Sequence, residues 1–388
     1  MPGWKHALTR IAHLGAVGAE ETFDTLRYKM RQRLGRTDPV VIQAYRSFGT
    51  EDSMLVWGRV LEDEGLKPPT DRDSVWRNLL STYRRFESDE VPGVRVRARY
   101  AGAEAEGVTD REGYFELYLH PTEPLPADRA WHSVALDLLD DVQPGRGPVR
   151  AEGPVLVPPP GAAFGIISDV DDTILRTNAT SLLKMARLTF LGNAHTRLPF
   201  EGVAAFYRAL RQGPTGEGEH PLFFVSSSPW NLYDFLVDFC DLRGIPRGPI
   251  LLRDLGLDRE KFIKASHHAH KLAQIQRVLA AYPALPFVLV GDSGQHDPEI
   301  YRQVVDDFPG RIRAIYIRDV TAEVRGTEVR RLADELAAHA VPMLLTKDSA
   351  EAAEHAAEYG LIHPDTLPDI RAEKAKDEAP PSDAEQLV

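Results

Sequence analysis

Continuous apolar runs alternate with helical stretches over the second half of the chain. Strands that helices cover on both faces read as unbroken apolar runs, whereas half-buried strands alternate apolar and polar residues. The pattern therefore predicts an α/β fold with a doubly wound, Rossmann-like parallel sheet. Six such runs are present, at residues 162–167, 222–225, 250–252, 287–290, 312–317 and 341–345.

Strict alternation marks a different region, residues 39–157. Val94, Val96 and Ala98 alternate with arginines, which is typical of a half-buried strand. Further strands are expected at residues 40–48, 54–61, 114–119 and 133–139, with a helix inserted near residues 73–86. We expect a small antiparallel β-sandwich accessory domain without a catalytic constellation, whose role is binding, orientation or support.

Apolar residues at spacings of three and four predict a helix over residues 4–36, in an N-terminal segment of residues 1–38. Arginines and Lys29 cluster at its end, so this amphipathic helix fits peripheral contact with an anionic membrane. The plainer interpretation is a helix docked on its own domain with a solvated face. His13, Gly15 and Gly18 argue against a cleaved secretory signal.

Three consecutive prolines, Pro158 to Pro160, mark a linker, because prolines cannot continue a sheet ladder. The α/β domain is expected over residues 161–365. Residues 371–388 hold mixed charge, two prolines and few apolar residues, which predicts a disordered tail.

Composition narrows the function classes. At 388 residues the chain has room for two or three domains, and 43% hydrophobic residues are ordinary for a globular protein. The net charge of -12 argues against nucleic acid as a partner, since phosphate backbones require a basic excess. Cys240 is the single cysteine, in an apolar context that suggests a buried thiol. No apolar run is long enough for a membrane span, so a cytoplasmic protein is the expectation.

Candidate chemistry follows the apolar runs, because functional residues of such sheets gather at the carboxyl ends of strands. Asp169, Asp171 and Asp172 come directly after the first run. Three carboxylates this close either hold a divalent cation or tune one acid against another. An acidic loop with an Asx turn is the alternative.

Two later runs and one helix start add to this cluster. The second run ends in Ser226 and Ser227 before a helix, a common anion-binding arrangement that is weak evidence alone. The fourth run ends at Asp292, with Asp297 five residues on. Lys271 lies at the start of a helix between these two runs.

In this order, the acid cluster, hydroxyl, lysine and second acid cluster resemble the four signature motifs of the haloacid dehalogenase superfamily of phosphotransferases. The motifs DVDDT (169–173), VSSSPWNL (225–232), His270-Lys271 and GDSGQHDPEIY (291–301) are more specifically similar to those of the actin-patch-type phosphatidate phosphatases. The resemblance is strong over residues 161–346 and only general over the β-rich region.

The resemblance implies a Mg²⁺-dependent phosphatase. Asp169 would attack phosphorus and carry an aspartyl-phosphate, and Asp171 would act as acid and then base. Mg²⁺ would be held by Asp169, the Asp171 carbonyl and Asp292. Ser226, Ser227 and Lys271 would hold the phosphoryl oxygens.

Several residues near these motifs keep more than one interpretation. Thr173 is expected to shape the first loop. Asp297 would reach the metal through water or orient Lys271. Asp172 fits a turn residue better than a second metal ligand, and Arg253 fits a surface salt bridge better than a substrate contact. The histidines His267, His268 and His270 are expected to be structural or substrate contacts rather than zinc ligands.

Spacing bears on substrate size. The intervals from Thr173 to Ser226 and from Ser226 to Lys271 are 53 and 45 residues, which leaves little room for an inserted lid. An open site accepts a phosphate on something large, such as a bilayer surface or a protein. This agrees with the substrate that the resemblance implies, phosphatidate, converted to diacylglycerol and phosphate. Two alternatives are a phosphatase of phosphoproteins or soluble phosphate esters, and a non-catalytic membrane- or protein-binding adaptor.

Overall fold

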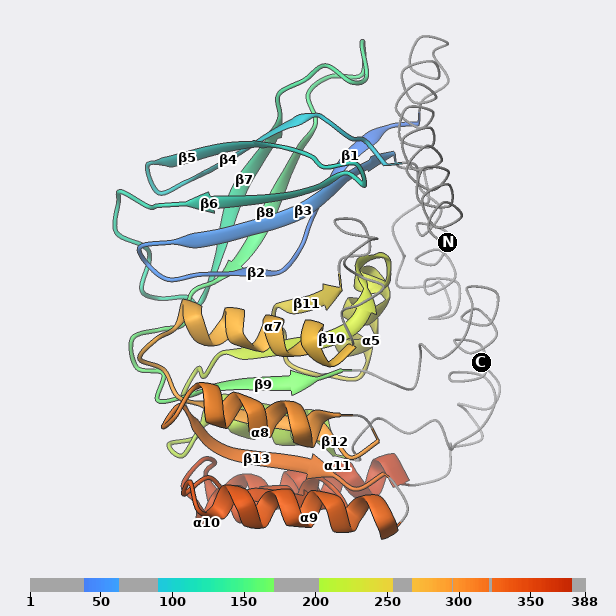
Figure 1. The fold of residues 1–388 in the computed structure, drawn as a ribbon. Coiled ribbons are helices and arrows are strands. Elements are labelled where there is room, and N and C mark those ends of the chain that lie inside the picture. Colours follow the sequence, from blue (N-terminus) through green and yellow to red (C-terminus); the bar gives the residue numbers. More distant parts are fainter. Residues whose placement is uncertain are drawn as a thin grey trace, which may run out of the picture.

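A six-stranded parallel sheet forms the centre of the C-terminal half of the molecule (Figure 1). The structure is a computed structural model that describes residues 38–62, 90–170, 202–253, 267–294, 296–320 and 323–378. The sheet order is β11-β10-β9-β12-β13-β14, and all six apolar runs are confirmed as its strands. They are β9 (Gly165–Asp169), β10 (Leu222–Pro229), β11 (Ile250–Arg253), β12 (Phe287–Asp292), β13 (Ile312–Arg318) and β14 (Met343–Thr346).

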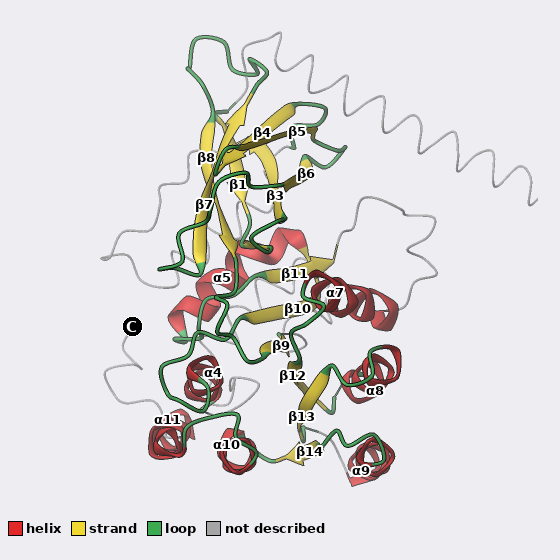
Figure 2. Ribbon diagram, turned by 90° about the vertical axis from the view of Figure 1, so that its left-hand side faces the viewer, coloured by secondary structure: helices red, strands yellow, loops and turns green. Residues whose placement is uncertain are grey.

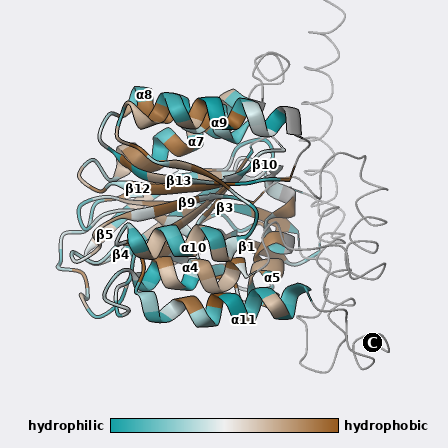
Figure 3. Cartoon of the chain, turned by 90° about the horizontal axis from the view of Figure 1, so that it is seen from below, coloured by the Kyte–Doolittle hydropathy of each residue, from teal (hydrophilic) through white to brown (hydrophobic). Residues whose placement is uncertain are grey.

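Helices cover both faces of this sheet (Figures 2 and 3). One face carries α7 (His267–Ala281), α8 (Asp297–Asp307) and α9 (Glu323–Ala337). The other carries α4 (Val203–Gln212), α5 (Tyr233–Leu242), α10 (Ser349–Glu358) and α11 (Leu367–Glu378). Two short 3₁₀ helices, η2 (Trp230–Leu232) and η3 (Pro364–Thr366), precede α5 and α11. From β9 the chain first adds β10 and β11 on one side, and it later adds β12, β13 and β14 on the other. Crossovers between parallel strands are right-handed, so the helices of these two halves cover opposite faces of the sheet.

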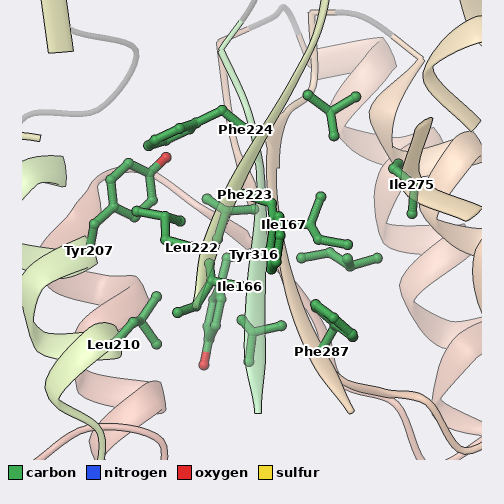
Figure 4. Packing of buried hydrophobic residues seen from close by; sticks show 14 of the residues in the cluster. Ile166, Ile167, Tyr207, Leu210, Leu222, Phe223, Phe224, Ile275, Phe287 and Tyr316 are labelled. Carbon is green, nitrogen blue, oxygen red and sulfur yellow. The ribbon is translucent and has the colours of Figure 1, made fainter. Parts of the chain in front are cut away.

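Apolar side chains on both faces of β9 explain the unbroken pattern in the sequence. Ile166 and Ile167 are fully buried. In Figure 4, Tyr207 and Leu210 of α4 lie on one side of β9, and Ile275 of α7 lies on the other. The carboxyl ends of β9, β10 and β12 meet at the edge where the sheet order reverses.

Two further sheets lie N-terminal to the parallel sheet. One has the order β1-β3-β6 and the other β2-β8-β7-β4-β5. Side chains of both, including Val56, Val96, Phe115 and Leu136, share a buried apolar cluster. The strands are β1 (Val40–Ala44), β2 (Ser47–Phe48), β3 (Met54–Glu62), β4 (Arg95–Tyr100), β5 (Ala103–Val108), β6 (Tyr114–Leu119), β7 (Trp131–Leu138) and β8 (Arg150–Leu156).

Two of these strands were missing from the sequence prediction. β5 lies at a sheet edge, and its alanine, glutamate and glycine residues have low strand propensity. β8 contains Gly153 and Pro154, which count against a strand when the sequence is considered alone. Pairing with β7 holds β8 in the sheet, and β8 also pairs in parallel with the two-residue β2.

The predicted disordered tail is wrong over its first eight residues. Residues 371–378 continue α11, whose Ile370 is 1% exposed. Glu373 accepts hydrogen bonds from Ala205 N and the Arg208 guanidinium, and Asp377 accepts one from Gly202 N. These polar contacts hold the end of α11 against α4 and the residue before it. The segment has few apolar residues, so the sequence alone did not predict a helix there.

Three predicted features lie wholly or partly outside the described residues: the helix over residues 4–36, the helix near residues 73–86, and the end of the tail. Among the described residues, no helix is long and apolar enough to cross a membrane. Cys240 is buried, as its apolar context predicted, and burial raises the pKa of its thiol to about 12.

Candidate active site

Lys271 lies between two carboxylates at the carboxyl edge of the parallel sheet. Its Nζ is 2.6 Å from Oδ1 of Asp169, the last residue of β9. It also donates to Oδ1 of Asp297, the first residue of α8. The three side chains are at most 3% exposed. Buried charges persist only when they are paired, so each of these groups depends on the others for its charge.

The second oxygen of Asp297 binds the neighbouring strand end. Its Oδ2 accepts a hydrogen bond from the backbone N of Asp292, 3.1 Å away. Gly291 makes this approach possible, because a Cβ at that position would lie 2.4 Å from the same oxygen. The carboxylate of Asp292 accepts a hydrogen bond from Gly294 N at 2.7 Å. Asp297 thus links Lys271 to the end of β12.

Asp169, Asp292 and Asp297 bring three carboxylates together. One oxygen from each lies within 4.8 Å of the others. Mg²⁺ prefers oxygen ligands and is usually bound by one or two carboxylates together with waters and substrate phosphate. Since Lys271 already contacts Asp169 and Asp297, the donor set that fits a cation best is Asp292 with the remaining oxygen of Asp169.

Ser226 lies in the irregular last part of strand β10. The pairing of β10 with β11 shifts register between Val225 and Pro229, so the intervening serines leave the regular ladder. The Oγ of the fully buried Ser226 accepts a hydrogen bond from Ser228 N at 3.0 Å. Ser227 is half-buried. This part of β10 places hydroxyls and backbone N–H groups beside the end of β9, with which β10 pairs up to Asp169.

Ser168 and Tyr207 lie beside Asp169, and the sequence analysis did not identify either of them. Ser168 donates from Oγ to the carbonyl of Asp169 at 2.9 Å, and its Oγ lies 2.5 Å from the hydroxyl of Tyr207. Burial raises the pKa of Tyr207 well above its usual value, and the nearby charge of Asp169 adds to the rise. Tyr301 donates to the carbonyl of Val290 at 2.7 Å. Both tyrosines sit on helices within ordinary amphipathic patterns, so nothing in the sequence distinguishes them.

The structure describes only some of the other candidate residues that the sequence indicated. Asp171, Asp172 and Thr173 lie outside the described residues. Arg253 ends β11 beside Pro229. His268 binds Gln303 through Nε2 at 3.2 Å, and its ring meets that of His296. The structure therefore brings together Asp169, Lys271, Asp292 and Asp297, with Ser226 on the adjacent strand.

The class of domain follows from comparison with known families. Residues 164–319 match the family model described as phosphatidate phosphatase APP1, catalytic domain. This segment runs from β9 through the end of β13 and contains every residue of the buried cluster, so the part of the chain that forms the site is similar to the catalytic domain of that family, as its motifs indicated.

Two curated relatives are similar to part of this chain. One is phosphatidate phosphatase APP1 of Saccharomyces cerevisiae, 34% identical over 156 residues, which are 40% of this chain and 26% of that protein. The other is an uncharacterized protein of Schizosaccharomyces pombe, 31% identical over 165 residues, 42% of this chain and 26% of that protein. The matched segment thus spans about a quarter of each relative's length.

Among solved structures, a carbohydrate acetylesterase from Xanthomonas citri is similar over 77% of this chain and 74% of its own. Its identity is 13% and the TM-score is 0.26, which carries no argument about fold or activity.

Proposed function

We propose that this protein is a Mg²⁺-dependent phosphomonoester phosphatase of the haloacid dehalogenase type, acting through an aspartyl-phosphate. The observation that carries the proposal is the buried cluster of Lys271, Asp169 and Asp297 beside Asp292, at the strand ends of a segment similar to a phosphatase catalytic domain. Under this proposal residues 161–365 form a Rossmann-like catalytic domain, and the two preceding sheets form an accessory β-sandwich.

Asp169 is the proposed nucleophile. Its carboxylate oxygen forms a bond to phosphorus while the ester P–O bond breaks, and Asp171 gives its proton to the leaving oxygen. Water then attacks phosphorus, the bond to Asp169 breaks, and Asp171 takes the proton from that water. The contact with Lys271 at 2.6 Å supports this role, because a neighbouring cation keeps the buried carboxylate ionised.

The phosphoryl oxygens need donors that are already in place before the reaction. Ser226 and Ser227 supply them from the last part of β10, and Lys271 supplies a charged donor. Mg²⁺, bound by Asp169, the Asp171 carbonyl and Asp292, supplies the positive charge that offsets repulsion between phosphate and carboxylate when it is present. Thr173, which lies outside the described residues, keeps the role that the resemblance gave it, support of the first motif.

Phosphatidate is the proposed substrate, released as diacylglycerol and phosphate. The match of residues 164–319 to the family model and the 34% identity over 156 residues to a protein named phosphatidate phosphatase support this choice, as do the short intervals between motifs. We further propose a cytoplasmic protein that contacts the membrane peripherally through residues 4–36.

The test measures phosphate release from phosphatidate in mixed micelles and from p-nitrophenyl phosphate, with Mg²⁺ and with EDTA. Asp169→Asn should lower the Mg²⁺-dependent rate by about 10³-fold or more. Asp334→Asn is the matched control, because this aspartate is exposed on α9 away from the cluster. Release from the soluble ester alone would retain the chemistry and reject the lipid substrate. Release from neither substrate would favour a binding role.

A further inference from the structure

Ser293 and Gly294 directly follow Asp292, the last residue of β12. Ser293 is fully buried, and its backbone N donates to the carbonyl of Arg318 at 2.8 Å. Gly294 N donates to Oδ1 of Asp292 at 2.7 Å. The orientation of the Asp292 carboxylate therefore depends on where the backbone of the two following residues lies.

Arg325 of α9 binds this backbone. Its Nε donates to the carbonyl of Ser293 at 3.2 Å. Its two terminal nitrogens donate to the two carboxylate oxygens of Glu299, at 2.5 and 2.7 Å. Glu299 lies in the first turn of α8, which begins at Asp297. One guanidinium thus joins the residue after Asp292 to the helix that carries Asp297.

The guanidinium of Arg325 is well suited to hold a backbone group. Two hydrogen bonds to one carboxylate fix both the distance and the plane of a guanidinium, so its remaining donor points in a defined direction. Here that donor meets the carbonyl of Ser293, a buried residue. The side chains of Arg325 and Glu299 are 22% and 33% exposed, which limits competition from water.

From these contacts we propose that Arg325 is a positioning residue for Asp292, acting through the backbone of Ser293. The proposal rests on the proposed function, because Asp292 is a ligand of Mg²⁺ only there. It places one determinant of the metal site on α9, beyond the end of the matched segment at residue 319. Figure 2 shows α9 on the same face of the sheet as α8.

The same two helices offer two matched controls. Arg302 of α8 also pairs with a carboxylate of α9, that of Glu335, with the nitrogen and oxygen 3.7 Å apart. Arg302→Met therefore weakens the contact between the helices farther along both of them. Glu328→Gln removes the charge of a further partner of Arg325, which lies 3.0 Å from its guanidinium and is 57% exposed. It leaves the other contacts of Arg325 in place.

The first readout is hydrogen–deuterium exchange of the amides of residues 292–294 in EDTA, which needs neither metal nor substrate. Arg325→Met should raise exchange there by about tenfold or more, and both controls should stay within about twofold of the unaltered protein. Unchanged exchange in Arg325→Met would overturn the proposal. An equal increase in Arg302→Met would also overturn it, since it would indicate general loosening of the two helices.

The second readout is the Kd for Mg²⁺, measured by isothermal titration calorimetry without substrate. Loss of a group that orients a metal ligand costs about 10- to 100-fold in affinity, so Arg325→Met should raise the Kd about tenfold or more. Both controls should stay within about twofold of the unaltered protein. Lysine keeps the charge but not the planar fork, so Arg325→Lys should recover only part of the affinity. An unchanged Kd in Arg325→Met would contradict the role of Arg325.

The two readouts separate the role of Arg325 from the proposed function. If the unaltered protein neither binds Mg²⁺ nor releases phosphate, the proposed function is refuted, and exchange at residues 292–294 still decides whether Arg325 orders this backbone. If Arg325→Met does not fold, Arg325→Lys replaces it in both measurements. Exchange and Kd values equal to those of the unaltered protein would then overturn the proposal.

Discussion

Replacing Lys271 by methionine tests the electrostatic core of the site. Methionine keeps the length of the side chain but removes the charge that lies between Asp169 and Asp297. Lys374→Met is the matched control, because Lys374 Nζ also lies 2.6 Å from a carboxylate oxygen, that of Asp348. The side chains are 2% and 3% exposed in the first pair, and 25% and 21% exposed in the second.

The difference in the loss of folding stability depends on burial, because both lysine nitrogens lie 2.6 Å from a carboxylate oxygen. Removing one partner of a buried ion pair costs about 3–5 kcal/mol, because the remaining charge is left without compensation. Pairs near the surface contribute about 0–1 kcal/mol. Lys271→Met should therefore lower the free energy of unfolding by at least about 2 kcal/mol more than Lys374→Met does.

Urea unfolding in EDTA, followed by tryptophan fluorescence, measures this difference without a metal ion that could replace the lost charge. Lys271→Met should also abolish phosphate release, and Lys374→Met should leave it unchanged. Equal destabilisation by the two substitutions would refute the claim that Asp169 and Asp297 depend on Lys271 for their charge.

Three further outcomes are expected. Gly291→Ala should lower phosphate release at least about tenfold and cost about 1–3 kcal/mol of stability, measured by kinetics and urea unfolding, because its Cβ would meet Asp297 Oδ2 at 2.4 Å. Stability should fall as pH drops from 7 to 5. Burial lowers the pKa of His220 in the folded protein, so below about pH 6.5, the usual pKa of a histidine, this residue binds more protons in the unfolded chain than in the folded one. His220→Gln should therefore make the melting temperature depend less on pH. Mg²⁺ at about 100 times its Kd should stabilise the protein by about 2.7 kcal/mol, and Asp292→Asn should remove that gain in the same melts.

Strands of the parallel sheet were predictable because burial on both faces forces an unbroken apolar run. The same reasoning placed Asp169, Ser226 and Asp292 at one edge, since parallel strands end together and each residue lies within two positions of the end of its run. Strands β5 and β8 were not predictable, because pairing partners rather than composition keep Gly153 and Pro154 in a sheet.

Contacts between helices were beyond the reach of sequence patterns. Lys271 and Asp297 lie on different helices, and the sequence left open whether Asp297 reaches the metal or orients the lysine. Whether the side chains of Lys271 and Asp297 meet depends on how closely α7 and α8 pack on the sheet. It also depends on how closely Asp297 can approach Gly291. Neither distance appears in hydrophobic periodicity. The contact is set by packing of the whole layer.

The same limit explains why the antiparallel sheets carried no functional signal in the sequence. Tyr45 reads as one apolar residue in a strand-rich region, and Trp230 as one aromatic residue after a serine turn. Only the fold brings their rings together at 4.6 Å. A region without predicted catalytic residues can still contact the site's surroundings, because Tyr45 packs on η2, which directly follows β10. The rings of Tyr45 and Trp230 therefore connect the two N-terminal sheets to the parallel sheet, although the matched segment, residues 164–319, contains none of the strands β1 to β8.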